Sequence, residues 1–508
     1  MLYNKTMKLR QQWFLILVFI FFLGAFLFRG IAVPDPDFGW HIQAGKNILA
    51  HGIPYTDQFS YSMPSYPFVD HEWLTNAVWA ITLSTFGMTP LLLFSTLLAL
   101  GSLVLQTLIV KKRWVSILIF LAGGTIFEFV GVRTQIITWF LLSFLMCILF
   151  DAKLWQRWRF FLPILFLFWA NVHGGFGIGL GVLGIVLLGR SLEEKKLVKE
   201  RLLILGLCIF ATLLNPFGLN LWWEFWMQLS DTQLRWAIAE WYPAFYFTNI
   251  AFWIYFSLST FLVVRYRKHF TRTELFLYTF LLVEGMASMR NIPIWVIASF
   301  FLTMRGINLL AKEAAKHLYG EERFAIAYRG FWVIAIGFFL PQMAAFFYGT
   351  YALRENQHQY PNEAVTYLSK HLPSEEIFST YDWGGYLDWQ LPQKKVFIDG
   401  RMPSWRWEAN NVGESNYAFD EYKKVMAGKL SFAAFSQKYQ VSTLLVPKSD
   451  LSAPTMKFFG ITVEKNSWMR KIFFSEFSFY KIVQQAKKEG WKEVYRDDTA
   501  VILEKPGS

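Results

Sequence analysis

Residues 13–33 read W-F-L-I-L-V-F-I-F-F-L-G-A-F-L-F-R-G-I-A-V, and the polar segment after them reads Asp35-Pro36-Asp37-Phe38-Gly39-Trp40-His41. About twenty apolar residues in a helix cross the hydrocarbon core of a bilayer. A small-residue site near Gly30 and Ala32 would also suit a cleaved signal peptide, but this run is long and aromatic. We therefore expect a retained transmembrane helix that delivers an acidic, histidine-containing segment to one face of the membrane.

The composition of the whole chain is that of a membrane protein. Of its 508 residues, 54% are hydrophobic and only 17% are charged, whereas soluble domains are about a quarter charged. The two cysteines, Cys147 and Cys208, lie inside apolar runs, which excludes a disulfide scaffold and a metal-type cysteine spacing. The net charge of +12 fits basic cytoplasmic loops better than nucleic-acid binding, because no nucleic-acid motif is present.

Further apolar stretches predict an α-helical polytopic membrane protein with about eleven transmembrane helices. The predicted spans are 13–33, 89–110, 114–132, 135–151, 159–171, 174–190, 201–217, 246–264, 273–288, 291–305 and 330–349. With the N-terminus in the cytoplasm, every basic cluster between spans falls on the cytoplasmic side, provided that residues 72–87 form an interfacial helix instead of a span. The predicted domains are thus a transmembrane domain, 1–350, with a large external loop, 34–88, and a soluble extracytoplasmic domain, 351–508.

The external segments carry most of the acidic, histidine and asparagine residues that lie near the membrane. Glu128 and Glu284 lie within or at the end of apolar runs, where ionisable groups are costly and by default mark a functional cavity. With two arginines at outer helix ends, the candidates on this face are Asp35, Asp37, His41, Asp70, His71, Glu72, Glu128, Arg133, Asn171, His173, Asn215 and Arg290.

Structural roles compete with functional ones for several of these residues. Asp35 and Asp37 would also suit the capping of a helix or turn after a proline, although the density of carboxylates and histidines favours a functional role. Arg133 and Arg290 would either bind phosphate or extend to lipid headgroups. The histidines lack the spacing of a metal pair on one helix, and carboxylates holding a divalent cation such as Mg²⁺ or Mn²⁺ are the better metal candidate. The tryptophan-rich stretch 222–243 suits an interfacial aromatic belt or stacking on sugar rings.

Beyond the last predicted span the composition becomes soluble and predicts an α/β domain of about 150 residues. Helices are expected at 361–371, 417–438 and 475–489, and extended segments at 377–380, 396–398, 441–446, 495 and 500–503. Two motifs lie between these elements: Asp382-Trp383-Gly384-Gly385-Tyr386 and Asp399-Gly400-Arg401. The second follows an expected strand, where ligand-contacting residues often lie, although Asp-Gly is also an ordinary turn.

The motifs together resemble glycosyltransferases of the GT-C fold, and more narrowly a bacterial set of GT-C-like membrane proteins. The resemblance extends over the whole chain, through D-x-D-x-x-W-H, I-P-x-x-D-x-F-S, H-E-W-L, N-x-H-G-G, N-P-x-G, R-N-I-P, W-G-G-Y-L and F-I-D-G-R, which begin at Asp35, Ile53, His71, Asn171, Asn215, Arg290, Trp383 and Phe397. The segment from Glu363 to Arg401 is also similar to the W-W-D-Y-G region of oligosaccharyltransferase catalytic subunits. It departs from that motif by reading Tyr381-Asp382-Trp383 with an additional glycine.

The resemblance implies an enzyme that transfers a sugar from a polyprenyl-phosphate donor to an extracytoplasmic glycan, lipid or protein. It implies a carboxylate base, which we assign to Asp35 or Asp37 with His41 nearby, and cations for the donor phosphate, which we assign to Arg133, Arg290 and His173. The remaining candidates would contact the acceptor or another part of the substrate: Asp70, His71, Glu72, Glu128, Asn171, Asn215, Trp383, Tyr386, Asp399 and Arg401.

The expected location is the cytoplasmic membrane of a bacterium, with the lipid bilayer as the surroundings and no nucleic-acid partner. Two other functions remain open: a transporter or flippase of lipid-linked glycans, and a non-catalytic partner in the assembly of a cell-envelope glycan. A flippase would favour polar residues near the midplane and inverted repeats, which the sequence does not show.

Overall fold

A computed structural model describes the chain in two compact units. The described residues are 2–33, 35–109, 115–196, 198–231, 234–317, 360–408, 411, 413–451, 455–458, 461–464 and 479–507, with single positions between 330 and 348. The first unit comprises Met1–Pro34, Thr82–Trp226 and Ile238–Tyr351, and the second comprises Asp35–Ile81, Met227–Ala237 and Ala352–Ser508. The predicted boundary near residue 350 lies outside the described residues, so it stays a prediction.

The first unit is helical throughout its described part. Its helices are α1 (Leu2–Ala32), α4 (Met88–Ile109), α5 (Val115–Ile126), α6 (Gln135–Phe150), α7 (Ala152–Trp158), α8 (Leu162–Val172), α9 (Phe176–Glu193), α10 (Lys199–Ala211), α13 (Ile250–Arg265), α14 (Arg272–Ala287) and α15 (Ile292–His317). Every predicted span from 13–33 to 291–305 overlaps one of them, and only single positions of the span 330–349 are among the described residues. The apolar runs therefore predicted the helices correctly.

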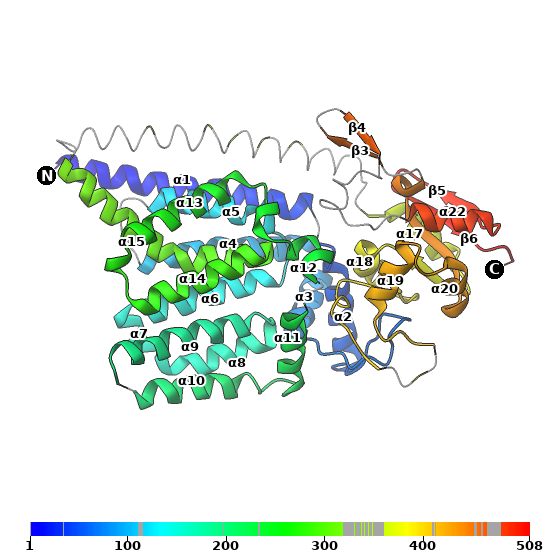
Figure 1. The fold of residues 1–508 in the computed structure, drawn as a ribbon, viewed down its shortest axis with the longest axis horizontal. Coiled ribbons are helices and arrows are strands. Elements are labelled where there is room, and N and C mark those ends of the chain that lie inside the picture. The colour runs from blue at the N-terminus through cyan, green and yellow to red at the C-terminus, as the bar shows by residue number, and fades with distance from the viewer. Residues whose placement is uncertain are drawn as a thin grey trace. The chain divides into compact units, whose positions relative to one another are not determined.

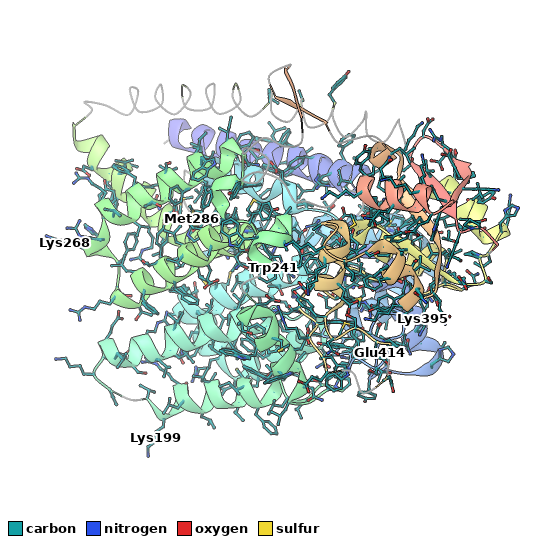
Figure 2. The ribbon with its side chains drawn as sticks, turned by 45° about the vertical axis from the view of Figure 1, so that its right-hand side comes forward. Lys199, Trp241, Lys268, Met286, Lys395 and Glu414 are labelled. Atoms are coloured by element: carbon teal, nitrogen blue, oxygen red, sulfur yellow. The ribbon has the colours of Figure 1, made fainter. Side chains whose placement is uncertain are left out.

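Neighbouring helices of this unit run side by side, for example α4 with α6 and α8 with α10 (Figure 1). Hydroxyl groups buried between them bond to one another: Ser259 Oγ lies 2.7 Å from Thr303 Oγ1 and 3.1 Å from the Tyr278 hydroxyl. Figure 2 shows Lys199 and Lys268 at one end of the unit and Trp241 toward the other end. Basic residues and the tryptophan-rich stretch thus lie toward opposite ends of this unit.

Four helical stretches among the described residues are long and apolar enough to cross a membrane: Leu15–Ala32, Met88–Thr107, Phe176–Glu193 and Met289–Glu313. A bent pair, Gln135–Phe150 with Ala152–Val172, would add a fifth if it forms one broken span; its two parts meet at 107°. The chain is therefore a helical membrane protein by length and composition, and a total of eleven crossings stays a prediction. Residues 72–87 form the separate helix α3 (Trp73–Phe86), which is not among these stretches.

The second unit combines Asp35–Ile81, which belong to the predicted first external segment, with the C-terminal part of the chain. From the former come α2 (Phe38–His51) and the beginning of α3. From the latter come α17 (Asn362–Lys370), β1 (Glu376–Ser379), α18 (Gly384–Gln390), α19 (Ala418–Met426), α20 (Phe432–Lys438), β2 (Val441–Pro447), β3 (Thr455–Phe458), β4 (Ile461–Glu464), α22 (Tyr480–Lys488), β5 (Lys492–Arg496) and β6 (Ala500–Glu504).

The main sheet has the strand order β1-β2-β6-β5, and Figure 1 labels its strands β5 and β6. Strands β1 and β2 pair in parallel, and the pairs β2–β6 and β6–β5 are antiparallel. The central strands β2 and β6 are buried almost throughout, as their runs of β-branched and aliphatic residues require, whereas the edge strand β5 is exposed. The expected α/β domain is present with a mixed sheet.

One predicted strand, 396–398, is not a strand of this sheet. Val396 instead forms an isolated parallel bridge with Ser60 of the first external segment. The Val396 amide donates to the Phe59 carbonyl at 2.9 Å, and the Tyr61 amide donates to the Val396 carbonyl at 3.0 Å. The apolar pattern was read correctly as extended backbone, but its partner lies more than 300 residues away in the sequence.

Candidate functional site

The candidate site begins at the turn that leads into α2. Its backbone is held locally, because the Asp37 amide donates to Asp35 Oδ1 at 2.9 Å and the Phe38 amide donates to the Asp35 carbonyl at 3.2 Å. Asp37 occupies the N-cap position of α2, but its side chain makes no capping hydrogen bond. The carboxylate of Asp37 is therefore not used as a helix cap, which was the competing structural role.

Close packing against glycines fixes this turn within the second unit. A Cβ atom at Gly39 would lie 2.0 Å from the Gly385 carbonyl oxygen, and one at Gly385 would lie 2.6 Å from the Pro36 carbonyl oxygen. The backbones of α2 and α18 therefore touch at their first turns. The sequence motifs D-x-D-x-G-W-H and W-G-G-Y-L are two sides of one contact, and Asp37 Oδ1 also lies against Gly400 of F-I-D-G-R.

A second polar group lies on the face of α2 that meets α3. His41 Nδ1 is 2.7 Å from Asn76 Oδ1 and 3.3 Å from Glu72 Oε2. The Asn76 amide group donates to both carboxylate oxygens of Asp70, at 3.1 and 2.9 Å. His71 Nε2 lies 3.6 Å from Glu72 Oε1. Four residues predicted from sequence, His41, Asp70, His71 and Glu72, are thus in one cluster.

Burial sets the ionisation of two members of this cluster. It lowers the pKa of His41 to about 3, against a smaller opposing effect of the hydrogen bond to Asn76. It raises the pKa of Asp70 to about 6, although the hydrogen bonds from Asn76 and from the Glu72 amide oppose the rise. At neutral pH the histidine is therefore neutral and the aspartate is ionised.

The Asp399-Gly400-Arg401 motif forms the buried centre of the unit. The Arg401 guanidinium binds Asp399 through Nε at 2.9 Å and pairs with Asp57 Oδ1 at 2.9 Å. Aromatic rings surround it, with the guanidinium carbon 4.6 Å from the ring centre of Phe59 and 5.1 Å from that of Trp405. Asp399 is fully buried and Arg401 nearly so. These contacts give both residues a clear structural role, and a contact with substrate stays a prediction.

Asp388 of α18 adds a third carboxyl group to this centre. Burial, followed by the charge of Asp399, raises its pKa well above the usual range for aspartate. The raised pKa favours the protonated form of Asp388, beside Asp57 and Asp399, which both pair with Arg401.

The other two C-terminal candidates differ in exposure. Trp383 is buried in the apolar core with Leu387. Tyr386 is partly exposed, donates a hydrogen bond to Asn362 Oδ1 and stacks on Tyr360 with ring centres 4.8 Å apart. Tyr386 is accordingly the one of the two that a ligand in solution can reach.

The remaining predicted residues lie in the first unit. Arg133 pairs with Glu240 at 2.7 Å, and the Arg290 guanidinium lies over the Trp241 ring, 5.1 Å from its centre. Because Glu240 and Trp241 are consecutive, Arg133 and Arg290 are brought to one place. Arg133, followed in effect by Arg290, lowers the pKa of Glu240 against the opposing effect of burial, so this carboxyl is ionised at neutral pH.

Two further predicted residues of this unit lie in separate polar contacts. Glu128 Oε1 accepts from Asn249 at 2.9 Å. His173 Nδ1 lies 2.9 Å from the Thr138 hydroxyl and accepts from the Gly175 amide at 2.7 Å.

The two predicted asparagines bond to backbone. Asn171 donates to the Leu167 and Leu214 carbonyls, and Asn215 accepts from the Phe217 amide within a turn. These contacts give Asn171 a structural role at the end of α8 and Asn215 one in a turn, and roles in binding stay predictions.

Sequence reasoning did not select Asp57, Asn76, Asp388 or Glu240. Asp57 belongs to the I-P-x-x-D-x-F-S phrase, and Asn76 lies one helical turn after Glu72, so both offered a signal. Asp388 and Glu240 are single carboxylates without a pattern, and their importance comes from neighbours distant in sequence. No group of three or more histidine, cysteine or acidic side chains suited to a metal ion occurs among the described residues.

These features define the chain as a helical membrane protein with a second unit that is built on a mixed sheet. Comparison with models of protein families gives no match, and comparison with curated proteins gives none either. Among solved structures, the chain is similar to the oligosaccharyltransferase of Archaeoglobus fulgidus, crystallised in complex with zinc and sulfate. The TM-score is 0.50 at 10% sequence identity, with 95% of this chain and 79% of that chain covered. The likeness concerns the fold and supports, loosely, the GT-C-like fold expected from the sequence.

Proposed function

We propose that this protein is a membrane glycosyltransferase that transfers a sugar from a polyprenyl-phosphate donor to an extracytoplasmic acceptor. The fold it shares with an oligosaccharyltransferase supports the class of reaction. The single observation that carries the proposal is the turn before α2, where Asp37 is held against Gly400 and does not cap the helix. A carboxylate held in this way is suited to accept a proton from an acceptor hydroxyl.

The proposed reaction is a displacement at the anomeric carbon. The acceptor oxygen forms the new bond to that carbon while its proton passes to the carboxylate of Asp37 or Asp35. The bond between the anomeric carbon and the phosphate oxygen breaks, and polyprenyl phosphate leaves with the electron pair. Arg133 and Arg290 are the proposed partners of the leaving phosphate, since guanidinium groups suit phosphate oxygens.

The proposed steps are assigned to side chains of this protein and none is routed through a metal ion. The archaeal oligosaccharyltransferase was crystallised with zinc, but the described residues of this chain contain no cluster that would hold such an ion. Two carboxylates such as Asp35 and Asp37 would need further oxygen ligands, for example from a substrate phosphate, to hold a divalent cation.

The experiment uses purified protein in liposomes that carry labelled polyprenyl-phosphate hexose, with envelope extract as the source of acceptor. Release of polyprenyl phosphate is followed for the wild type, Asp37→Asn and Asp35→Asn. Asp498→Asn, at an exposed aspartate of the same unit, is the matched control. Loss of a general base is expected to slow release about 10²- to 10⁴-fold in one of the two site variants.

Size-exclusion profiles and thermal unfolding must match the wild type for that result to count. Equal release by the wild type and both variants would contradict the assignment of the base. A wild type that releases no polyprenyl phosphate with any hexose donor would contradict the proposed reaction and favour a flippase or a non-catalytic partner.

A further inference from the structure

A row of three hydrogen-bonded side chains connects the loop before α3 with the face of α2 that follows Asp37. It runs from Asp70 through Asn76 to His41, with heavy-atom distances of 2.9, 3.1 and 2.7 Å. All three residues are buried: Asn76 is fully enclosed, Asp70 is 2% exposed and His41 is 5% exposed. Hydrogen bonds in such surroundings have defined partners, because an unpaired buried group is costly.

The ionised carboxylate of Asp70 determines the direction of the hydrogen bonds from Asn76 to His41. An ionised carboxylate only accepts hydrogen bonds, so the NH₂ of Asn76 must face Asp70. The Asn76 oxygen then faces His41 Nδ1, and an oxygen can only accept. The other group near Nδ1, Glu72 Oε2, is also an acceptor. His41 therefore carries its proton on Nδ1, which leaves a lone pair on Nε2.

Packing around these three side chains holds this arrangement in place. Gly45 lies one turn after His41 on the same face of α2, and a Cβ atom there would lie 2.0 Å from the Asn76 carbonyl oxygen. The close approach of the two helices sets the distance between His41 and Asn76. The rings of Trp40 and Trp79 flank the imidazole, with centres 3.7 and 5.6 Å from its own.

Nε2 of His41 differs from Nδ1 in its surroundings. The hydrogen bond to Asn76 and the contact with Glu72 both involve Nδ1 of the imidazole. Nε2 has no such contact with described residues, and it is not one of the fully buried atoms without a hydrogen-bond partner. A nitrogen with a lone pair thus remains open to a donor from outside the protein, four residues after the Asp37 carboxylate.

We propose that His41 Nε2 accepts a hydrogen bond from a sugar hydroxyl of the substrate, and that Asn76 and Asp70 are positioning residues that fix the tautomer required for this. The inference rests on the proposed glycosyl transfer and adds a specificity contact to it. A substrate lacking that hydroxyl would bind less well, because the lone pair of His41 Nε2 would then have no hydrogen-bond donor.

The charged groups around His41 support the same tautomer over a defined pH range. Glu72 contacts Nδ1, Asp70 lies behind Asn76, and His71 and Arg401 both lower the pKa of His41. The raised pKa of Asp70, about 6, means that protonation of this carboxyl would weaken its control over Asn76 in mildly acidic solution. The tautomer is thus best defined above pH 6.

Two substitutions at His41 separate the role of Nε2 from that of Nδ1. His41→Asn places an amide near the position of Nδ1 and nothing at Nε2, whereas His41→Gln places an amide oxygen near Nε2. We expect His41→Asn to raise KM about tenfold with a smaller change in kcat, as loss of one hydrogen bond predicts, and His41→Gln to restore KM in part. His51→Asn and His51→Gln, at the exposed end of α2, are the matched controls.

Nitrogen-15 NMR of histidine-labelled protein in nanodiscs measures the tautomer without any assay of activity. We expect His41 of the wild type to show the Nδ1–H form at pH 7.5, with the His41→Asn spectrum giving the assignment. Asn76→Leu and Asp70→Asn should each shift the signal toward a tautomer mixture. Two positioning variants are used so that poor folding of one still leaves a test.

The outcomes are distinct for the two proposals. Wild-type KM in both His41 variants, equal losses in both, or an Nε2–H tautomer in the wild type would each overturn the inference. If the wild type transfers no sugar at all, the proposed function fails while the tautomer measurement still decides the positioning role of Asn76 and Asp70.

Discussion

Asp37 Oδ1 lies so close to Gly400 that a Cβ atom at that glycine would be 1.7 Å from the carboxylate oxygen. The aspartate of the first external segment and the F-I-D-G-R motif of the C-terminal part therefore form one surface. A side chain at position 400 would occupy the space of the carboxylate. Gly400 is thus a determinant of where Asp37 points, and this relationship is directly testable.

Gly400→Ala should displace the Asp37 carboxylate and slow sugar transfer about a hundredfold, since displacement of a reacting group by about 1 Å has effects of that size. The measurement is release of polyprenyl phosphate in liposomes, together with thermal unfolding. Gly181→Ala is the control, because nothing lies within 4 Å of a Cβ atom there. Full activity in Gly400→Ala would show that the position of Asp37 is unimportant.

Gly39→Ala should destabilise the second unit without touching a candidate catalytic side chain. The added methyl group would lie 2.0 Å from the Gly385 carbonyl oxygen, and backbone cannot move away as a flexible side chain would. Overpacking of this kind costs about 1–3 kcal/mol in the free energy of unfolding. Denaturant unfolding in detergent measures it, with Gly206→Ala in an open helical position as the control. Unchanged stability would mean that α2 and α18 can separate freely.

Arg401→Met should be more damaging than removal of an exposed arginine. It leaves Asp57 and Asp399 buried without their cation, and breaking a buried ion pair costs about 3–5 kcal/mol. Arg496→Met, which removes an exposed ion pair with Glu493 in the same unit, should lower the stability far less. Comparison of the two unfolding midpoints gives the answer. Similar losses would contradict the view that Arg401 holds the centre of the unit.

Asp70 should make stability depend on pH in a predictable direction. Its pKa rises from 3.8 to about 6 on folding, so the folded state binds the proton more tightly than the unfolded chain. Relative to Asp70→Asn, the wild type is most stable below about pH 4 and loses about 3 kcal/mol as the pH rises from about 4 to about 6. Unfolding of both proteins across this range tests the sign. A difference that stays constant or grows with pH would contradict the burial of an ionisable Asp70.

The sequence predicted the helices of the first unit well, because a long apolar run has few alternatives to a helix. It also placed α17, β1, β2 and β6 close to their observed positions. It did not predict that Val396 would pair with Ser60, since a three-residue extended segment carries no information about a partner so distant in the chain. The continuous helix expected at 417–438 is two helices, α19 and α20, separated at Gly428, whose φ of 72° favours glycine.

The candidate site was predicted by residue type and not by arrangement. The density of carboxylates and histidines in the first external segment led directly to Asp37, His41, Asp70 and Glu72. The residues that hold them, Asn76 and Gly45 above all, are uncharged or lack a side chain and give no comparable signal. Their role follows only from the contact between two helices, which depends on packing that the sequence pattern does not specify.

Glu240→Gln should strengthen the binding of polyprenyl phosphate, if Arg133 is a phosphate ligand. The Glu240 carboxylate pairs with the Arg133 guanidinium at 2.7 Å. Arg133 lowers the pKa of Glu240, so this carboxylate stays ionised and competes with an anionic ligand for Arg133. Removing its charge should tighten Kd about three- to tenfold at low salt, and less at high salt, where the competing charge is screened. Fluorescent polyprenyl phosphate titrated onto protein in nanodiscs provides the measurement. Glu493→Gln, at an exposed ion pair of the second unit, is the control, and Arg133→Gln should weaken binding. Equal affinity in the wild type, Glu240→Gln and Arg133→Gln would remove Arg133 from the phosphate site.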